Sequence, residues 1–160
     1  MVIVTGVGTK FIEELPLGIH KLAEGAPSDI IKVALYGPNA VLNPSLLTYT
    51  TTGEVTGGGY TAGGVTQPLI IVGKTGSSRA GGVQFGEGSY IQPTTDTSIV
   101  FTGGATRGVL MYNSSQSNRM IFVLDFGANF IPSSGVKITW GVAGVGLFSE
   151  VLIPLLGTIS

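Results

Sequence analysis

RGVLMYN at residues 107–113 and RMIFVLDF at residues 119–126 are two β-rich runs, and SSQSN at residues 114–118 separates them. β-Branched and aromatic side chains favour strands, and a short polar connection between two such runs is typical of an antiparallel pair. This stretch therefore predicts a β-hairpin.

Further short β-rich runs lie on both sides of this hairpin. They occupy residues 30–36, 65–73, 83–91, 98–101, 136–140 and 147–156, and a short strand is also expected within 46–51. Pro68 lies inside the second of these runs, which predicts an edge strand or a bulge there because proline cannot donate to a β-ladder. Many short strands with glycine, serine and threonine turns predict a mainly all-β fold, either a β-sandwich or a jelly-roll-like domain.

Residues 9–24 are the one helical candidate in the sequence. Phe11, Ile12 and Leu15 recur at helical spacing, and Thr9 is the expected N-terminal cap. Pro16 and the glycine at position 18 follow, so we expect only one or two helical turns. The β-rich fold should therefore carry a short N-terminal helical segment.

Length and composition describe one domain with little charge. The 160 residues fit a single domain spanning 1–160, with residues 1–24 as a possible N-terminal arm. Charged residues make up 11% of the chain, the net charge is -1, and no run of lysine or arginine occurs. This balance disfavours nucleic-acid binding. No apolar run reaches the length of a membrane-spanning helix, and an apolar surface with few charges indicates assembly with other subunits.

The stretch GEVTGGGYTAGG at residues 53–64 matches a dinucleotide-binding pattern by letter, through Gly57-x-Gly59-x-x-Ala62. That pattern needs a helix immediately after it, because the helix N-terminus holds the pyrophosphate. Here Gly63 and Gly64 lead into a β-rich run, so we expect a glycine-rich turn instead. Gly73-Lys74-Thr75 resembles the end of a phosphate loop, but the required upstream glycine is replaced by Pro68. No cofactor is expected.

Residues able to carry catalysis or bind metal are scarce. His20 is the only histidine, and the chain has no cysteine, so neither a zinc site nor a nucleophile–histidine pair is indicated. Asp125-Phe126-Gly127 matches a kinase triplet in letters only, and we interpret it as a strand end with a turn. We expect no catalytic, cofactor-binding or metal-binding residues, and no enzymatic activity.

Three alternatives stay open at this point. A glycosidase pair needs only two carboxylates in one cleft, and the candidates are Glu54, Glu87, Asp96, Asp125 and Glu150. A sugar-binding platform could form from aromatic side chains that otherwise serve as core or turn anchors, namely Tyr49, Tyr60, Tyr90, Tyr112 and Trp140. Asn113-Ser114-Ser115 is a formal glycosylation acceptor, although no secretion signal accompanies it.

Several of these segments together resemble a family of small tailed-phage virion proteins. The specific part is the Glu-Val-x-Gly-x-Gly-Tyr-x-Ala-Gly-Gly core within residues 53–64. Weaker matches cover most of the chain between residues 10 and 148, at residues 11–20, 31–36, 49–52, 124–127 and 138–140. Residues 73–88 depart from the family pattern because they are unusually rich in glycine.

The resemblance implies a structural component of the virion, foremost a capsid decoration or cement protein on the outer surface of the head. It implies the major capsid protein as partner, self-association as a dimer or trimer, and synthesis in the host cytoplasm before assembly on the capsid surface. A tail, neck or fibre-base protein and a virion-attached carbohydrate-binding module are the alternatives. The candidate contact residues are Phe11, Ile12, Glu54, Gly57, Gly58, Gly59 and Tyr60.

Overall fold

The structure is a computed structural model that describes residues 2–22, 28–72, 90–93 and 96–138. A hairpin between residues 106 and 130 forms its centre. Strand β7 (Thr106–Asn113) pairs antiparallel with β8 (Arg119–Phe130). Ser117 and Asn118 end the connecting loop with φ angles of 53° and 57°. These are left-handed values, which asparagine adopts more readily than most residues. The predicted hairpin is confirmed.

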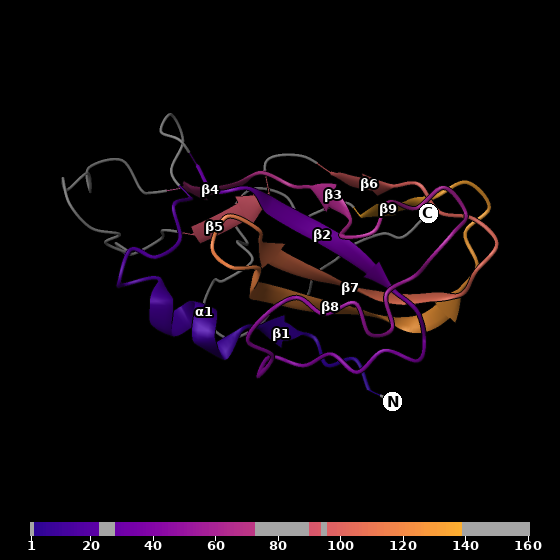
Figure 1. Cartoon of the computed structure of the whole chain (residues 1–160), viewed down its shortest axis with the longest axis horizontal. Helices are drawn as coiled ribbons and strands as arrows, with labels where there is room; N and C mark the ends of the chain where they lie inside the picture. The colour runs from indigo at the N-terminus through magenta and orange to yellow at the C-terminus, as the bar shows by residue number, and fades with distance from the viewer. Residues whose placement is uncertain (1, 23–27, 73–89, 94–95, 139–160) are drawn as a thin grey trace.

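Three more strands extend this hairpin into a five-stranded antiparallel sheet with the order β1-β8-β7-β2-β3 (Figure 1). Strand β2 (Ile31–Tyr36) lies against β7 along its whole length. The two edge strands, β1 (Gly6–Val7) and β3 (Val65–Thr66), are only two residues long each. Such short edges offer little template for pairing with another chain.

Two smaller antiparallel pairs accompany the main sheet. Strand β4 (Leu69–Val72) pairs with β5 (Tyr90–Pro93), and β6 (Thr97–Ile99) pairs with β9 (Val136–Ile138). In the part of the chain that the structure describes, α1 (Thr9–Glu14) is the only α-helix. The expectation of a mainly all-β domain with a short N-terminal helix is confirmed.

Apolar side chains cover the main sheet on both faces. On one face, residues of β2, β7 and β8 pack against β6, β9 and the N-terminal segment, through Phe11, Leu15, Leu22, Ile99, Val136 and Ile138. On the other face, alternate residues of the same strands pack against Ile3, Ala40, Leu42 and the partly buried Leu46 and Tyr49. Because both faces are buried, the central strands read as nearly continuous apolar runs, and the layering is sandwich-like.

Some boundaries differ from the sequence-based expectations. Gly8, not Thr9, is the N-cap of α1, and no side chain caps the helix. Residues 46–51 form no named strand, because only Thr48 makes an isolated bridge, to Arg119. The run 65–73 is split into β3 and β4 around Pro68, which cannot supply a ladder hydrogen bond. The strand expected at 147–156 and most of the one at 83–91 lie outside the described residues.

Candidate functional site

Glu54 is the centre of the glycine-rich stretch. Its backbone makes an antiparallel bridge with Tyr36 at the end of β2. One carboxylate oxygen accepts hydrogen bonds from the Tyr60 hydroxyl at 2.5 Å and the Gly63 amide at 2.7 Å. The other accepts one from the Tyr49 hydroxyl at 2.5 Å. The Glu54 carboxylate therefore links Tyr49, which precedes the glycine-rich stretch, to Tyr60 and Gly63 within it.

Tyrosine side chains connect this loop to the sheet. The Tyr60 hydroxyl accepts a hydrogen bond from the Leu35 amide at 3.0 Å, and the Tyr112 hydroxyl donates to the Gly63 carbonyl at 2.8 Å. The rings of Tyr49 and Tyr112 stack with centroids 4.5 Å apart. Burial, together with the neighbouring Glu54 carboxylate, raises the pKa of Tyr49, Tyr60 and Tyr112 above the ordinary value. These hydroxyls therefore stay protonated and can donate.

At two glycines of the loop, an added side chain would overlap a backbone carbonyl oxygen. A Cβ on Gly64 would lie 1.9 Å from the Val33 carbonyl oxygen, and one on Gly58 would lie 2.2 Å from the Thr102 carbonyl oxygen. Both residues also have positive φ angles, 76° and 55°. A strand, β3, follows Gly64 directly. The helix that a dinucleotide-binding loop requires is therefore replaced by sheet, as the sequence predicted.

Some of the candidate contact residues are exposed to solvent, and the others are buried or hydrogen-bonded within the protein. Ile12 and Gly57 to Gly59 are exposed. Phe11 is fully buried in the core, and the functional atoms of Glu54 and Tyr60 are taken by the hydrogen bonds within the loop. Burial removes Phe11 from any contact surface, while Glu54 and Tyr60 are half-buried and hold the loop. Phe11 sits on the inward side of a short helix, where helical spacing alone does not separate core from contact.

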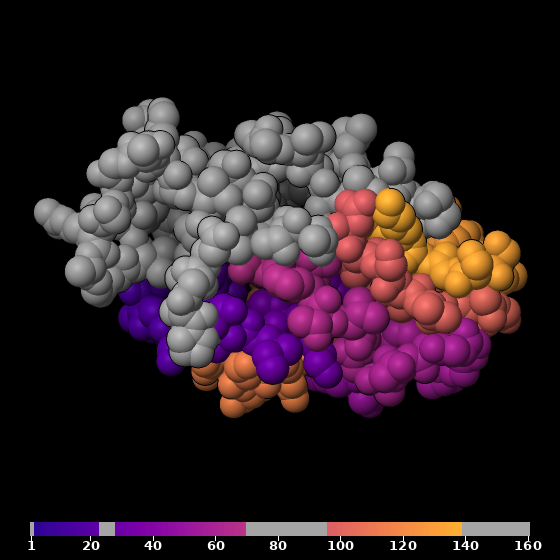
Figure 2. All heavy atoms as spheres, turned by 90° about the horizontal axis from the view of Figure 1, so that it is seen from above, coloured from indigo at the N-terminus to yellow at the C-terminus, as the bar shows by residue number. Residues whose placement is uncertain are grey.

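The exposed members do not form one surface. Helix α1 follows β1 at one edge of the five-stranded sheet, whereas residues 53–64 lead into β3 at the other edge. On the face seen from above, the visible indigo atoms lie toward the left end of the molecule and most of the magenta atoms lie toward the right end (Figure 2). The two candidate contact regions are therefore separate.

A second polar network surrounds His20, whose side chain is fully buried. Its Nε2 lies 2.9 Å from a Glu14 carboxylate oxygen, and its Nδ1 lies 3.0 Å from the Asn113 amide nitrogen. Arg119 binds the other oxygen of Glu14, and Asn113 also donates to Asp29 at 2.7 Å. Each partner of the histidine is thus a structural hydrogen-bonding group, as expected for a lone buried histidine.

This network also determines whether the Asn113 side chain is accessible for glycosylation. The Asn113 side chain is fully buried, and its amide nitrogen contacts both His20 and Asp29. Its carbonyl oxygen accepts hydrogen bonds from the amides of Ser115 and Gln116. The side chain is therefore inaccessible in the folded protein, so the acceptor sequence is not usable there.

The other carboxylates that could form a glycosidase pair have separate partners. Asp125 binds Arg107 through two bonds of 2.6 and 3.0 Å, and Asp96 pairs with Lys137 at 3.0 Å. With Glu54 engaged in its loop, the three described candidates are held in three different structural contacts. Glu87 and Glu150 lie outside the described residues.

Asp125-Phe126-Gly127 is a bulge within β8, not the strand end with a turn that we expected. The pairing of β7 with β8 shifts between Thr106 and Gly108, and Gly127 has a φ angle of 80°. The Gly127 amide donates to the Asp125 carboxylate at 2.9 Å. Extra residues accommodated at such an irregularity allow the strand to continue to Phe130.

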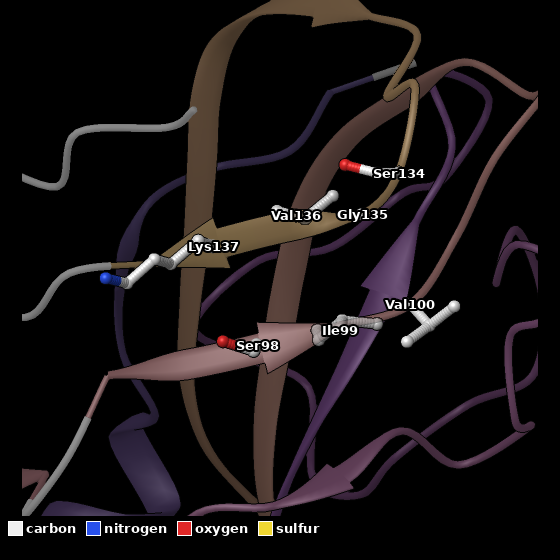
Figure 3. A pocket seen from close by; sticks show the side chains of 7 residues that line it. All are labelled: Ser98, Ile99, Val100, Ser134, Gly135, Val136 and Lys137. Atoms are coloured by element: carbon white, nitrogen blue, oxygen red, sulfur yellow. The ribbon is translucent and has the colours of Figure 1, made fainter.

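The described surface has open, shallow pockets, and the described residues form no cluster of metal-binding side chains. Figure 3 shows an open groove of about 330 Å³ over β6 and β9, lined by Ser98, Ile99, Val100, Ser134, Gly135, Val136 and Lys137. In the described ranges, no group of three or more histidine, aspartate or glutamate side chains could hold a metal ion. The one helix found there is much too short to cross a bilayer.

Sequence reasoning identified Tyr60 as the anchor of the loop but missed the carboxylate that it binds. It also missed Tyr49 and Tyr112 as partners in the same network. The only available signal was a lone glutamate within a glycine stretch that also contains a tyrosine. The side chains of Tyr90 and Trp140, the other members of the possible sugar platform, lie outside the described part.

The fold and site define an all-β domain with a locked glycine-rich loop. Comparison with protein-family models, with curated proteins and with solved structures gave no match. The resemblance to virion proteins therefore stays a prediction.

Proposed function

We propose that this chain is a non-enzymatic structural protein of a tailed-phage virion, with capsid decoration as its leading role. The observation that carries the proposal is an exposed apolar patch formed by Val2 and Val4 of the N-terminal segment together with Val41. Their side chains are 59%, 43% and 58% exposed. In a chain with few charges, such a patch suits attachment to another protein surface.

Backbone pairing explains why this patch faces outward. Ile3 and Leu42 form a parallel bridge, with hydrogen bonds from the Val4 amide to the Leu42 carbonyl at 2.8 Å and from the Leu42 amide to the Val2 carbonyl at 3.2 Å. Ile3 and Leu42 point into the core. Because side chains alternate along extended backbone, their neighbours point away from it. Backbone hydrogen bonds between residues 2–4 and Leu42 thus hold the patch in place.

The internal use of the distinctive polar residues also supports a structural role. Glu54 and three tyrosines hold the loop, and the exposed glycines at 57–59 present backbone rather than reactive side chains. Such a surface suits contact with a repeating shell, where many modest contacts add up through multivalency. The partner would be the major capsid protein, bound on the outer head surface by a dimer or trimer of this chain.

The test is binding to undecorated heads and to tail tubes of the phage that encodes the chain, measured by cosedimentation. The proposal expects wild-type protein to bind heads, and Val41→Asp combined with Val2→Asp to weaken binding at least tenfold. Ile131→Asp is the matched control, because Ile131 is also apolar and exposed but lies outside the patch. Binding to tail tubes alone would favour the tail, neck or fibre-base alternative instead. A glycan array with strong signal and no head binding would favour the carbohydrate-binding alternative.

A further inference from the structure

The environment of His20 requires a neutral imidazole. An amide NH₂ group can only donate hydrogen bonds, so the Asn113 nitrogen 3.0 Å from Nδ1 needs an unprotonated ring nitrogen there. Nε2 then carries the proton and donates a hydrogen bond to the Glu14 carboxylate. The network thus assigns one tautomer to His20.

Asn113 cannot turn around to accept a proton on Nδ1 without breaking other bonds. Its carbonyl oxygen binds the amides of Ser115 at 3.1 Å and Gln116 at 3.2 Å, and its nitrogen binds Asp29. A flipped amide would place its oxygen against the Asp29 carboxylate and its nitrogen against two backbone donors. The orientation that excludes a charged His20 is therefore held from several directions.

The charged groups around the ring partly oppose one another. Glu14 on α1 contacts Nε2, and Arg119 on β8 pairs with that same carboxylate. Asp29, just before β2, faces the ring across Asn113 and also accepts a hydrogen bond from the Lys21 amide. Burial lowers the pKa of His20, while the Asp29 carboxylate opposes that change. The Phe11 ring completes the enclosure, with its centroid 4.6 Å from that of the histidine.

We propose that His20 is a proton-operated latch: uptake of a solvent proton on Nδ1 breaks its bond to Asn113 and releases residues 9–22 from the β7–β8 hairpin. This inference goes beyond the proposed virion role and does not depend on it. The released segment would expose the inward faces of Phe11 and Leu15, which the neutral latch keeps in the core.

The segment is suited to local release. Helix α1 has only six residues, too few to be stable without tertiary contacts. The central strands β2, β7 and β8 have their own ladder and do not need the helix for pairing. Opening should therefore affect residues 9–22 first and leave the main sheet folded.

The ordinary pKa of histidine sets the pH window, since the open segment would titrate near 6.5. Because the closed state binds the proton less well, acid favours opening below this value. For one proton, the opening constant rises by up to about tenfold per pH unit between the open-state and closed-state pKa values. The latch is closed at neutral pH and above.

The experiment combines a histidine titration with hydrogen exchange in the wild-type chain. As His20 is the only histidine, its ring signals in NMR are unambiguous. The proposal expects the Nε2-protonated tautomer at pH 7.5. Protection factors of amides 9–22, corrected for intrinsic exchange, should drop about tenfold or more by pH 5. Amides in β7 and β8 should keep theirs.

His20→Gln separates the latch from general acid sensitivity. Glutamine can donate to Glu14 and accept from Asn113, but it does not titrate, so protection of residues 9–22 should become independent of pH between 7.5 and 5. If this variant does not fold, the wild-type titration still decides. A His20 pKa at or above 6.5, unchanged protection at pH 5, or acid opening that persists in His20→Gln would overturn the proposal.

Discussion

Glu54 shows how much structure one carboxylate can organise. It receives hydrogen bonds from two tyrosine hydroxyls and a backbone amide, and these donors lie on both sides of the glycines. Hydrogen bonds to a charged group contribute more than neutral ones. The glycines supply the positive φ angles, but the carboxylate selects which of their many conformations persists.

Replacing the carboxylate with its amide tests this role. We expect Glu54→Gln to lower the free energy of unfolding by about 2 kcal/mol, because the amide loses charge and turns one acceptor into a donor facing other donors. Urea denaturation at pH 7 measures the change. Glu13→Gln is the control, since Glu13 is exposed and forms an ion pair with the likewise exposed Lys10 at 3.0 Å. It should change stability by less than about 0.5 kcal/mol. Equal losses in the two variants would mean that the Glu54 network contributes little.

Gly57 and Gly64 form a matched pair for separating strain from crowding. Their φ angles are nearly the same, 77° and 76°, but a Cβ on Gly57 would meet nothing within 4 Å whereas one on Gly64 would overlap the Val33 carbonyl. Gly57→Ala should therefore cost only the left-handed strain, about 1 kcal/mol. Gly64→Ala should cost about 4 kcal/mol or more, or prevent folding. Thermal unfolding of both variants provides the comparison, and similar melting temperatures would refute the close approach at Gly64.

At the scale of elements, the β7–β8 hairpin could be predicted because its signals are local: β-rich runs and a polar connection. Elements determined by distant partners could not. Strand β1 is two residues that extend only because Phe122 and Val123 lie beside them. The bridge at Thr48 likewise depends on Arg119. The same reason hid the network around His20, since Asn113 is 93 residues from His20 in the chain.

The hairpin loop gives a prediction of its own. Asn118 has a φ angle of 57°, which β-branched residues adopt at a high cost. Asn118→Gly should keep or slightly raise stability, whereas Asn118→Val should be less stable than the glycine variant by about 1–2 kcal/mol. The two midpoints in urea measure the difference directly. A valine variant as stable as the glycine variant would rule out the left-handed geometry at this position.

At the scale of the whole molecule, low charge leaves stability to the apolar core, with two aspartates adding an acid-sensitive component. Burial would raise the pKa of Asp125, but its hydrogen bonds with Arg107 and the Gly127 amide outweigh this and lower it. Burial is likewise outweighed at Asp29 by hydrogen bonds from Asn113, the Lys21 amide and Gln116. A carboxyl with a lowered folded-state pKa stabilises the fold above its unfolded value of 3.8.

Stability should therefore decline as the pH falls below about 4, through the folded-state pKa values of these aspartates. Asp125 is partly exposed, so its share should not exceed about 1 kcal/mol. Asp125→Asn should be less stable than wild type at pH 7 and should lose less stability between pH 5 and pH 3. Urea midpoints measured across this range give the answer. Parallel pH profiles for the two proteins would show that the Arg107 pair contributes nothing.

The pairing of β1 with β8 has a consequence for the order of events during synthesis. Gly6 and Val7 emerge from the ribosome early, but their partners Val123 and Phe122 follow about 115 residues later. At roughly 5–20 residues per second, that interval lasts on the order of 6 to 23 s. Over that time the nascent N-terminal segment, with Phe11 and Leu15, has no sheet to cover. Phe11 and Leu15 can take their buried places only after the β7–β8 hairpin has been made.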